Sequence, residues 1–496
     1  MSRTLVSGVI WNALGRGLPL LLALLLTPAL LHLLGIERWG LFTLALAIVG
    51  VFGVFDFGVG QALTRALAER LGAGEAHDAA ALIGSALTAL AAISLLGAGV
   101  IFALVPLLVE RVLAVPEALR PQAVGALRVL SLAAPLVVVN AALWGVLAAY
   151  QRFREANLVT IPVSIFYYLG PLLVLLVWDD LTGVMLALVA CRLANTLSYA
   201  WLVRQRLHRI PLGRIRAALV LPLLRVGGWM TFSGTLTQAL LYADRFLIGA
   251  LLSLAAVAYY ATPLDLVLRM WILPVAVQQT LMPALAATFR RQPAETAALL
   301  RRGALAIMAL VFPACLLLVG GADEILTLWL GSGFAAGGAG VLGILGVGIF
   351  FSCAAFAPSS LIDAIGRPDV TARFSLVQAL VFLPLSAGML VWLGIEGAAI
   401  AWALRAAADA AGRLVLAVRL YPAAREAARQ VAPALAAGGA GLAVVALAGS
   451  PAIAVAAGLC ALAAFGVCAV LALAPDERAA LRQPRALIGM LRGGAV

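Results

Sequence analysis

The sequence contains no lysine, only three histidines and five dispersed cysteines, although it is 496 residues long. The absence of lysine excludes a P-loop, and neither a GxSxG nor an HExxH string occurs. The histidines are isolated, and the cysteines lie in apolar stretches without a CxxC pair, which argues against metal sites and disulfide frameworks. We therefore expect a protein that is not an enzyme, with no catalytic residues, no metal and no cofactor.

Charged residues are also scarce, at 11% of the chain, whereas hydrophobic residues make up 64% and the mean hydropathy is +1.09. This composition leaves too little polar surface for a soluble globule of this length. The net charge of +12 comes entirely from arginines, most of which fall in short segments between apolar spans. The positive charge therefore indicates membrane orientation rather than binding to nucleic acid.

The apolar residues form fourteen segments of the length that a membrane-spanning helix needs, about 20 residues. The sequence thus predicts an all-α integral membrane protein with about 14 transmembrane helices. The segments are expected near residues 7–34, 40–67, 81–109, 122–150, 157–178, 181–203, 219–250, 255–286, 303–321, 336–362, 371–392, 397–418, 431–449 and 451–474.

The arginines divide unevenly between alternate loops of this segmentation. If the N-terminus is cytoplasmic, the inner loops and tails hold 24 arginines and the outer loops hold only Arg38, Arg111 and Arg120. Such an excess is what the positive-inside rule requires. We therefore expect a multi-pass membrane protein with both termini in the cytoplasm. Four tryptophans at the predicted outer helix ends agree with this orientation: Trp39, Trp178, Trp329 and Trp392.

Several residues recur at a spacing of about 214 residues. Trp178 and Trp392 differ by 214, Arg192 and Arg405 by 213, and Arg152 and Arg367 by 215. Six helices per copy predict two pseudo-symmetric lobes of like orientation around a central cavity. We expect an N-terminal lobe at 1–216, a C-terminal lobe at 217–421, and two further helices with a cytoplasmic tail at 422–496. Helix-length periodicity alone also produces such offsets, so this alternative stays open.

Ionisable residues inside the predicted spans are the best candidates for a functional site, because charge is costly in a bilayer. Seven arginines and four aspartates have this position, and arginine suits phosphate or carboxylate oxygens, so we expect an anionic cargo. Pairs at i and i+4 favour another reading, in which ion pairs lock helices together. The residues are Arg16, Arg128, Arg192, Arg245, Arg269, Arg405, Arg413, Asp56, Asp244, Asp265 and Asp409; Asp265 with Arg269 and Asp409 with Arg405 and Arg413 have the i, i+4 spacing.

Prolines and glycines also lie inside three of the predicted spans, where they are expected to interrupt or loosen the helix. We expect Pro19 and Pro28 to interrupt the first helix, and glycines at 227, 228 and 234 to loosen the seventh. Pro263, Pro274 and Pro283 are expected to break the eighth. Such breaks are tolerated where freed backbone groups face protein or water, and they provide bending points.

Four stretches resemble signature segments of a known family: FDFGVGQALTRALAE (55–69), YADRFLIG (242–249), AYYATPLDLVLRMWILP (258–274) and DAIGRPD (363–369). Together they resemble the polysaccharide transporter, or oligosaccharide flippase, family of the multidrug/oligosaccharidyl-lipid/polysaccharide exporter superfamily. The likeness covers roughly residues 1–420. It implies a flippase that moves an undecaprenyl-diphosphate-linked oligosaccharide, an O-antigen or exopolysaccharide repeat unit, across the bacterial inner membrane.

Under this hypothesis transport proceeds by alternating access, with arginines holding the diphosphate and aspartates acting as counter-charges or in ion coupling. The expected partners are the polyprenyl-diphosphate-linked glycan, the lipid bilayer, and a polysaccharide polymerase or chain-length protein, with no nucleic acid. The expected substrate-binding residues are Arg16, Arg65, Arg245 and Arg269, and the expected acidic residues are Asp56, Asp244 and Asp265.

Three alternatives remain at this point. A lipid II flippase or a multidrug exporter of the same superfamily would share the two lobes, although a cavity for cationic drugs should be acidic. A membrane polymerase or ligase of lipid-linked glycans would need a sizeable outer catalytic loop, which the segmentation does not contain. Neither the glycan, the coupling ion nor the oligomeric state follows from the sequence.

Overall fold

The computed structural model describes residues 3–52, 59–72, 79–206, 216, 218–222 and 242–481, and within this part every regular element is a helix. Eleven helices of the described part are long and apolar enough to cross a membrane. The protein is therefore an all-α integral membrane protein, as predicted. The chain folds into two compact units, Met1–Ala261 and Thr262–Val496.

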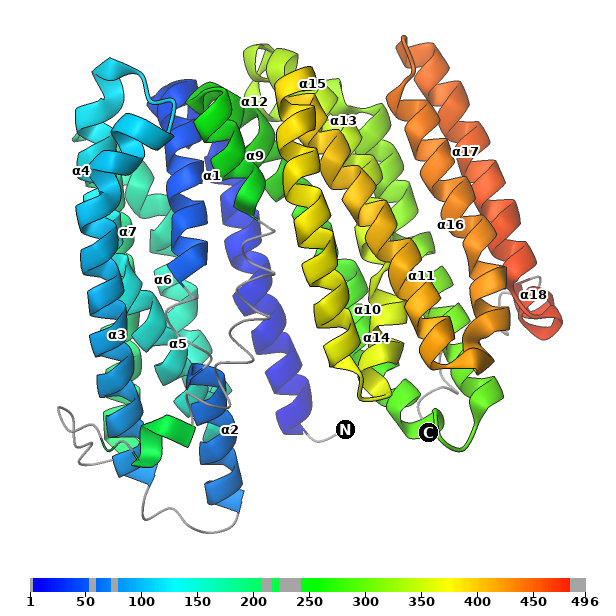
Figure 1. Cartoon of the computed structure of the whole chain (residues 1–496), viewed down its shortest axis with the longest axis horizontal. Coiled ribbons are helices and arrows are strands. Elements are labelled where there is room, and N and C mark those ends of the chain that lie inside the picture. The colour runs from blue at the N-terminus through cyan, green and yellow to red at the C-terminus, as the bar shows by residue number, and fades with distance from the viewer. Residues whose placement is uncertain are drawn as a thin grey trace. The chain divides into compact units, whose positions relative to one another are not determined.

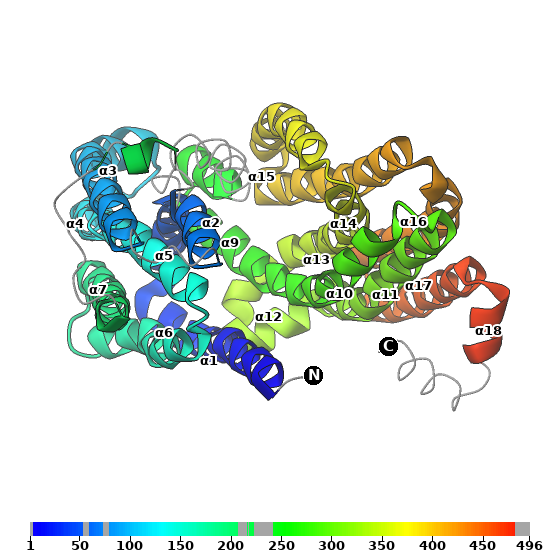
Figure 2. The ribbon, with the colours of Figure 1, turned by 90° about the horizontal axis from the view of Figure 1, so that it is seen from below.

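The first unit consists of helices that run side by side, as its two views show (Figures 1 and 2). α5 packs against α2, α3 and α7, and α6 packs against α1 and α7. A core of leucine, isoleucine and valine fills the space between α2, α3, α5 and α7. The helices are α1 (Arg3–Val51), α2 (Val59–Gly72), α3 (Ala79–Leu107), α4 (Arg120–Ser131), α5 (Ala133–Ala149), α6 (Phe153–Leu175) and α7 (Leu181–Arg206), followed by α9 (Leu254–Leu268), which continues into the second unit.

The second unit is built around α13, which packs against α11, α12, α15 and α16. Buried aromatic rings hold this packing together: the Phe312 and Phe465 ring centroids lie 4.3 Å apart, and Phe350 meets Phe312 edge to face. The helices are α10 (Ile272–Thr288), α11 (Pro293–Gly320), α12 (Ala322–Leu330), α13 (Ser332–Ala354), α14 (Phe356–Ala364), α15 (Pro368–Leu420), α16 (Arg425–Ala446), α17 (Pro451–Ala472) and α18 (Pro475–Leu481).

The outward faces of these helices carry apolar side chains, which is the pattern expected where lipid replaces water. Leu96 and Trp392 are 73% and 88% exposed, respectively, and Leu317 is 71% exposed. In lipid such residues gain little by burial, so the helices associate through close packing of small and apolar side chains. The exposed apolar surface is therefore the membrane-facing surface.

The count of fourteen spans stays a prediction, since several expected spans merge or lie outside the described residues. α15 holds both 371–392 and 397–418 around a kink at Gly394 (φ 63°), and α1 holds 7–34 and the start of 40–67 around a kink at Gly35 (φ 73°). Only glycine adopts such positive φ angles without strain. Most of 219–250, including the glycines at 227, 228 and 234, lies outside the described residues.

The prediction that Pro19 and Pro28 interrupt the first helix is wrong, because α1 is helical through both and departs from helical geometry only at Gly35. A proline inside a transmembrane helix is tolerated when the freed carbonyl finds another partner. In the eighth span the helix does break, at a 3₁₀ turn over Arg269–Trp271. Proline at 274 has no N–H to donate to the carbonyl of residue 270, which explains a break at this point. The expected breaks at Pro263 and Pro283 are wrong, because α9 and α10 are helical through these residues.

Two turns that lie 215 residues apart have the same local geometry. Arg152 is the N-cap of α6 and Arg367 is the N-cap of α15, and each donates its backbone N–H to the carbonyl of the residue five positions earlier, Leu147 and Ile362. The preceding residue has a positive φ in both turns, 57° at Gln151 and 78° at Gly366. The two six-helix repeats themselves stay a prediction.

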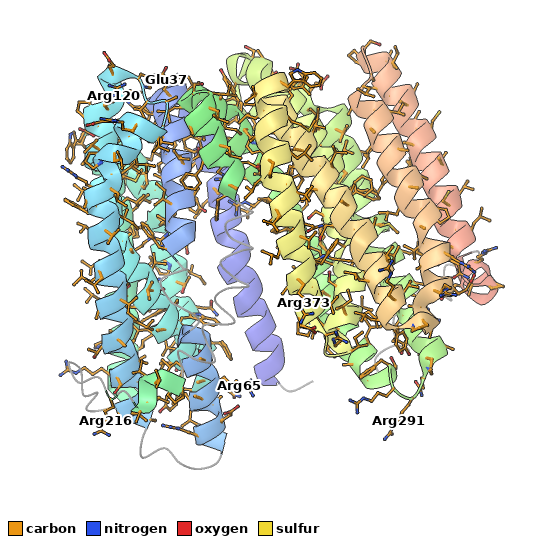
Figure 3. All side chains as sticks on the ribbon, viewed as in Figure 1. Glu37, Arg65, Arg120, Arg216, Arg291 and Arg373 are labelled. Carbon is orange, nitrogen blue, oxygen red and sulfur yellow. The ribbon has the colours of Figure 1, made fainter. Side chains whose placement is uncertain are left out.

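The ends of the first unit agree with the predicted orientation (Figure 3). Arg65 and Arg216 lie at one end of this unit, whereas Glu37 and Arg120 lie at the other. The sequence assigns the first pair to inner segments and Arg120 to an outer one. The lobe boundary at 216–217 and the central cavity stay predictions.

Candidate functional site

The broken helix that joins α9 to α10 presents one arginine of the predicted site. Arg269 opens the 3₁₀ turn and is exposed, and no hydrogen bond or ion pair joins its guanidinium to another described residue. Two residues later, the Trp271 indole Nε1–H donates to the Ser352 hydroxyl over 3.0 Å, and its ring lies 6.4 Å from that of Phe356. The tryptophan fixes the turn against α13 and α14, while the arginine stays open for a ligand.

The predicted i, i+4 ion pair between Asp265 and Arg269 is not formed. α-helical geometry ends at Leu268, so Arg269 no longer has the direction that would place it above Asp265. Asp265 itself is half-buried near the end of α9. The guanidinium of Arg269 is therefore not neutralised by this carboxylate.

Asp244 and Arg245 are buried within the first unit, in the helical segment 242–250. Asp244 is 0% and Arg245 2% exposed. The Tyr260 hydroxyl on α9 donates to Oδ2 of Asp244 over 2.8 Å, and the Arg245 guanidinium lies 5.3 Å from the Tyr242 ring centroid. Both charges are thus held by aromatic residues, and in this arrangement neither is open to a ligand.

The other predicted site residues are dispersed. Arg65 lies on α2, is exposed, and pairs with Glu69 one turn later over 2.8 Å. This pair raises the pKa of Arg65 further, through the hydrogen bond and the charge of Glu69. Arg16 lies on α1, but its side chain is outside the described part, and Asp56 is wholly outside it. The structure therefore brings together Asp244 and Arg245 but not Arg65.

Two arginines that we did not select occupy matching places in the two halves. Arg192 on α7 lies 5.3 Å from the Tyr167 ring and its Nη2 is 3.3 Å from the tyrosine hydroxyl. Arg405 on α15 lies 5.0 Å from the Phe382 ring. Each is eleven residues beyond the start of its helical stretch, Leu181 or Gly394, which is about 16 Å along the helix axis.

The repeat offset of these arginines was visible in the sequence, but their aromatic partners were not. A guanidinium over an aromatic face is stabilised without a carboxylate, which accounts for arginines at these two places in apolar helices. Among the predicted pairs of α15, Arg413 does bond to Asp409 over 2.8 Å and also to the Ser359 hydroxyl over 3.0 Å. Arg405 contacts rings instead of Asp409.

The sequence profile described as "Polysaccharide biosynthesis protein" matches residues 5–289, more than half of the chain. The chain belongs to this family. It is also 25% identical over 412 residues to a Shigella flexneri protein named "Putative O-antigen transporter", covering 82% of this chain and 96% of the relative. These findings confirm the family inferred from the sequence.

Solved structures show the same fold. A lipid II flippase MurJ in an inward closed conformation aligns with a TM-score of 0.72 at 13% identity, covering 93% of this chain and 98% of MurJ. An inward-facing multidrug resistance transporter of the MATE family aligns with a TM-score of 0.68 at 15% identity, covering 83% and 98%. This member of the polysaccharide biosynthesis family is thus a membrane protein with the fold of flippases and transporters.

Proposed function

We propose that the protein is a flippase that translocates an undecaprenyl-diphosphate-linked oligosaccharide, such as an O-antigen or exopolysaccharide repeat unit, by alternating access. It would work in the bacterial inner membrane with both termini in the cytoplasm. The family and the O-antigen transporter relative support this class of cargo. The excess of intramembrane arginine over aspartate supports an anionic headgroup.

One observation carries the proposal furthest: Arg269 is exposed within a broken transmembrane helix and has no carboxylate partner among the described residues. An intramembrane guanidinium without a counter-charge is costly unless it faces water or an anionic ligand. Its planar fork of donors matches the oxygens of a diphosphate. We assign Arg269 the first contact with the diphosphate.

The remaining site residues are assigned more specific roles. Arg16 and Arg65 are proposed as further phosphate contacts, and Arg245 would join them in a conformation that releases it from burial. Asp56, Asp244 and Asp265 are proposed as counter-charges or coupling groups. Asp244 accepts a hydrogen bond from Tyr260 and is completely buried beside Arg245, so we propose it as a counter-charge.

The proposal is tested with purified protein in liposomes that contain a fluorescent undecaprenyl-diphosphate oligosaccharide, by following its loss from one leaflet. Arg269→Ala should slow flipping at least tenfold, whereas Arg269→Lys should retain part of the rate because it keeps the charge. Arg291→Ala is the matched control, since Arg291 is also exposed but lies in the turn between α10 and α11 (Figure 3). Normal flipping by Arg269→Ala would remove Arg269 from the site.

The same liposomes separate the alternatives. A lipid II flippase would move lipid II faster than the oligosaccharide carrier, and a multidrug exporter would move a cationic dye instead. A polymerase or ligase would lengthen or transfer the glycan, which thin-layer chromatography of the extracted lipid would detect. The proposal requires that the carrier changes leaflet with its glycan unaltered.

A further inference from the structure

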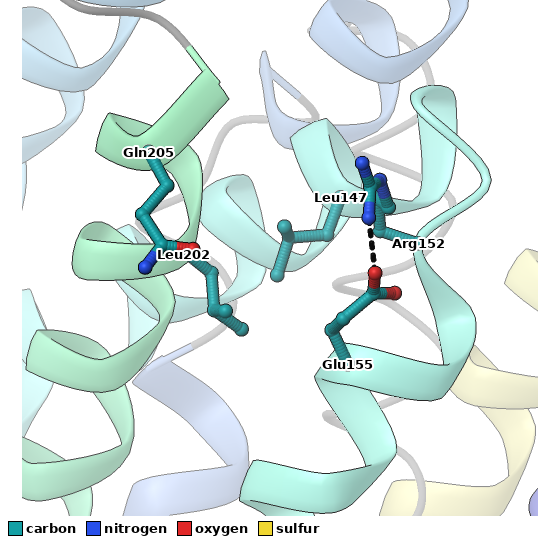
Figure 4. A pocket seen from close by; sticks show the side chains of 5 residues that line it. All are labelled: Leu147, Arg152, Glu155, Leu202 and Gln205. Carbon is teal, nitrogen blue, oxygen red and sulfur yellow. Dashed lines mark hydrogen bonds and ion pairs between the residues drawn. The ribbon is translucent and has the colours of Figure 1, made fainter.

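One end of the first unit contains an open hollow that the proposed transport site does not use. It encloses about 270 Å³ including its open mouth, and Leu147, Arg152, Glu155, Leu202 and Gln205 line it. Arg152 and Glu155 form one wall, Gln205 lies opposite, and the two leucines lie between them (Figure 4). The hollow therefore combines an apolar floor with a charged wall and an amide.

The arginine in this wall is held in a fixed place by the backbone. Arg152 follows Gln151, which has a φ of 57°, and its N–H donates to the Leu147 carbonyl over 2.8 Å. Its guanidinium pairs with Glu155 one turn into α6. The side chain is 28% exposed, so the guanidinium contacts Glu155 and still reaches the surface.

The charge around the hollow is positive. Arg154 and Arg204 are exposed next to lining residues, and Glu155 is the one acidic residue among those that line it. The arginine distribution of the sequence places this end in the cytoplasm, where the leaflet surface is anionic. Basic residues close to such a surface are attracted to it.

An apolar stripe leads from the hollow along α7. Leu197 and Trp201 precede Gln205 at intervals of four residues, so all three lie on one face of the helix. Leu197 and Trp201 are 60% and 61% exposed. An acyl chain along this stripe would end at Gln205, which places a lipid headgroup at the hollow.

We infer that this hollow binds the phosphate of an acidic phospholipid, with Arg152 as the main contact, Gln205 as a second donor and the acyl chain along Leu197 and Trp201. A phosphodiester fits better than a diphosphate, because a single guanidinium lines the hollow and Glu155 opposes further negative charge. Glu155 competes with the phosphate for Arg152 and so sets the affinity of the hollow for the phospholipid.

Native mass spectrometry of the full chain, released from micelles with equal amounts of phosphatidylglycerol and phosphatidylcholine, tests the site. We expect the wild type to retain phosphatidylglycerol preferentially, and Arg152→Gln to reduce this preference at least threefold. Glu155→Gln should raise the preference, because it frees Arg152. At the exposed residue Gln205 no ion pair is lost, so Gln205→Arg should raise the preference and Gln205→Glu should lower it.

Arg367→Gln is the matched control, because it breaks the pair with Asp369 in the repeat-related turn and removes the same charge. Equal retention of the two lipids by the wild type would overturn the inference, as would equal losses in Arg152→Gln and Arg367→Gln. A parallel series with undecaprenyl diphosphate distinguishes the sources: stronger retention of that lipid through Arg152 would assign the hollow to the carrier instead. The measurement needs no transport, so its failure is separate from failure of the flippase proposal.

Discussion

The hydroxyl of Tyr260 donates a hydrogen bond of 2.8 Å to Asp244, and both side chains are completely buried. A buried carboxylate is costly unless donors surround it, so this bond ties the segment 242–250 to α9. The contact gives Asp244, the intramembrane aspartate of YADRFLIG, a structural role in the first unit. Any role of Asp244 in transport must be compatible with this hydrogen bond.

Tyr260→Phe should lower the free energy of unfolding by about 1–3 kcal/mol, because it leaves the buried carboxylate short of this donor. Thermal unfolding in detergent micelles measures the effect. Tyr150→Phe is the control, since Tyr150 is half-buried and its hydroxyl makes no hydrogen bond within the described residues. Equal stability of the two variants would show that Asp244 does not depend on Tyr260.

The Tyr260 bond also shows what the sequence could not predict. Helical spans and the Asp409–Arg413 pair follow from local periodicity, because the partners lie one turn apart on one helix. Tyr260 and Asp244 lie on different helical segments, and their contact depends on how these segments pack. α1 departs from helical geometry at Gly35 and not at Pro19 or Pro28, where interruptions were expected. This outcome also depends on packing, since a lipid-embedded helix accommodates proline when neighbouring groups donate to the freed carbonyl.

The candidate site was partly predictable for a related reason. The high free-energy cost of a charge inside a membrane identified the candidate site residues, including Arg269. The 3₁₀ turn at Arg269 follows from Pro274. The exposure of each candidate side chain could not be predicted from the sequence. Arg245 is buried and Arg269 is exposed, although both lie in apolar runs. The contacts of Arg192 with Tyr167 and of Arg405 with Phe382 were missed because a ring twenty or more residues away gives no local signal.

The contact of Arg405 with the Phe382 ring should appear as a coupling energy. In a double-mutant cycle with Arg405→Met and Phe382→Leu, we expect about 0.5–2 kcal/mol of coupling, because the ring faces a guanidinium at 5.0 Å. The repeat-related cycle of Arg192→Met with Tyr167→Leu should give a similar value, and Tyr167→Phe separates the ring from its hydroxyl. Chemical unfolding in micelles supplies the energies.

A cycle that combines Arg405→Met with Tyr167→Leu is the control, since these residues belong to different contacts and their effects should add. Additivity in the Arg405–Phe382 cycle itself would contradict the proposed stabilisation. In that case the ring would only fill space beside the arginine.

Glu477 should hold α18, the last helix that the structure describes, against α11. Its carboxylate, 11% exposed, accepts hydrogen bonds from Arg301 over 2.8 Å and from Arg302 over 2.5 Å, and Arg301 also reaches Gln430 on α16. Glu477→Gln should lower stability by about 1.5–3 kcal/mol, the range for hydrogen bonds to charged groups. Thermal unfolding in micelles at neutral pH checks this value, with Glu324→Gln as an exposed control outside this hydrogen-bond network.

The contribution of Glu477 should also depend on pH. Burial alone would raise the pKa of Glu477, but the hydrogen bonds from Arg302 and the Ala474 N–H and the charges of Arg301 and Arg302 outweigh it and lower the pKa. The stabilisation is therefore complete above the ordinary glutamate pKa of about 4.3 and is lost as the pH falls through the lowered value. The stability gap between wild type and Glu477→Gln should be constant from about pH 6 to 8 and shrink below about pH 4. A gap that persists to about pH 3 would contradict this account.

Gly40 is required for the close approach of α1 to α9. A Cβ at Gly40 would lie 1.8 Å from the Leu254 carbonyl oxygen, and backbone cannot move aside as a flexible side chain can. Gly40→Ala should therefore cost at least about 3 kcal/mol, at the upper end of overpacking effects. Gly99→Ala is the matched control, because nothing lies within 4 Å of a Cβ there and alanine favours the helix by about 0.5–1 kcal/mol. Yield of monodisperse protein and thermal unfolding report both variants. A Gly40→Ala protein as stable as Gly99→Ala would mean that α1 and α9 are farther apart in the membrane than the structure places them.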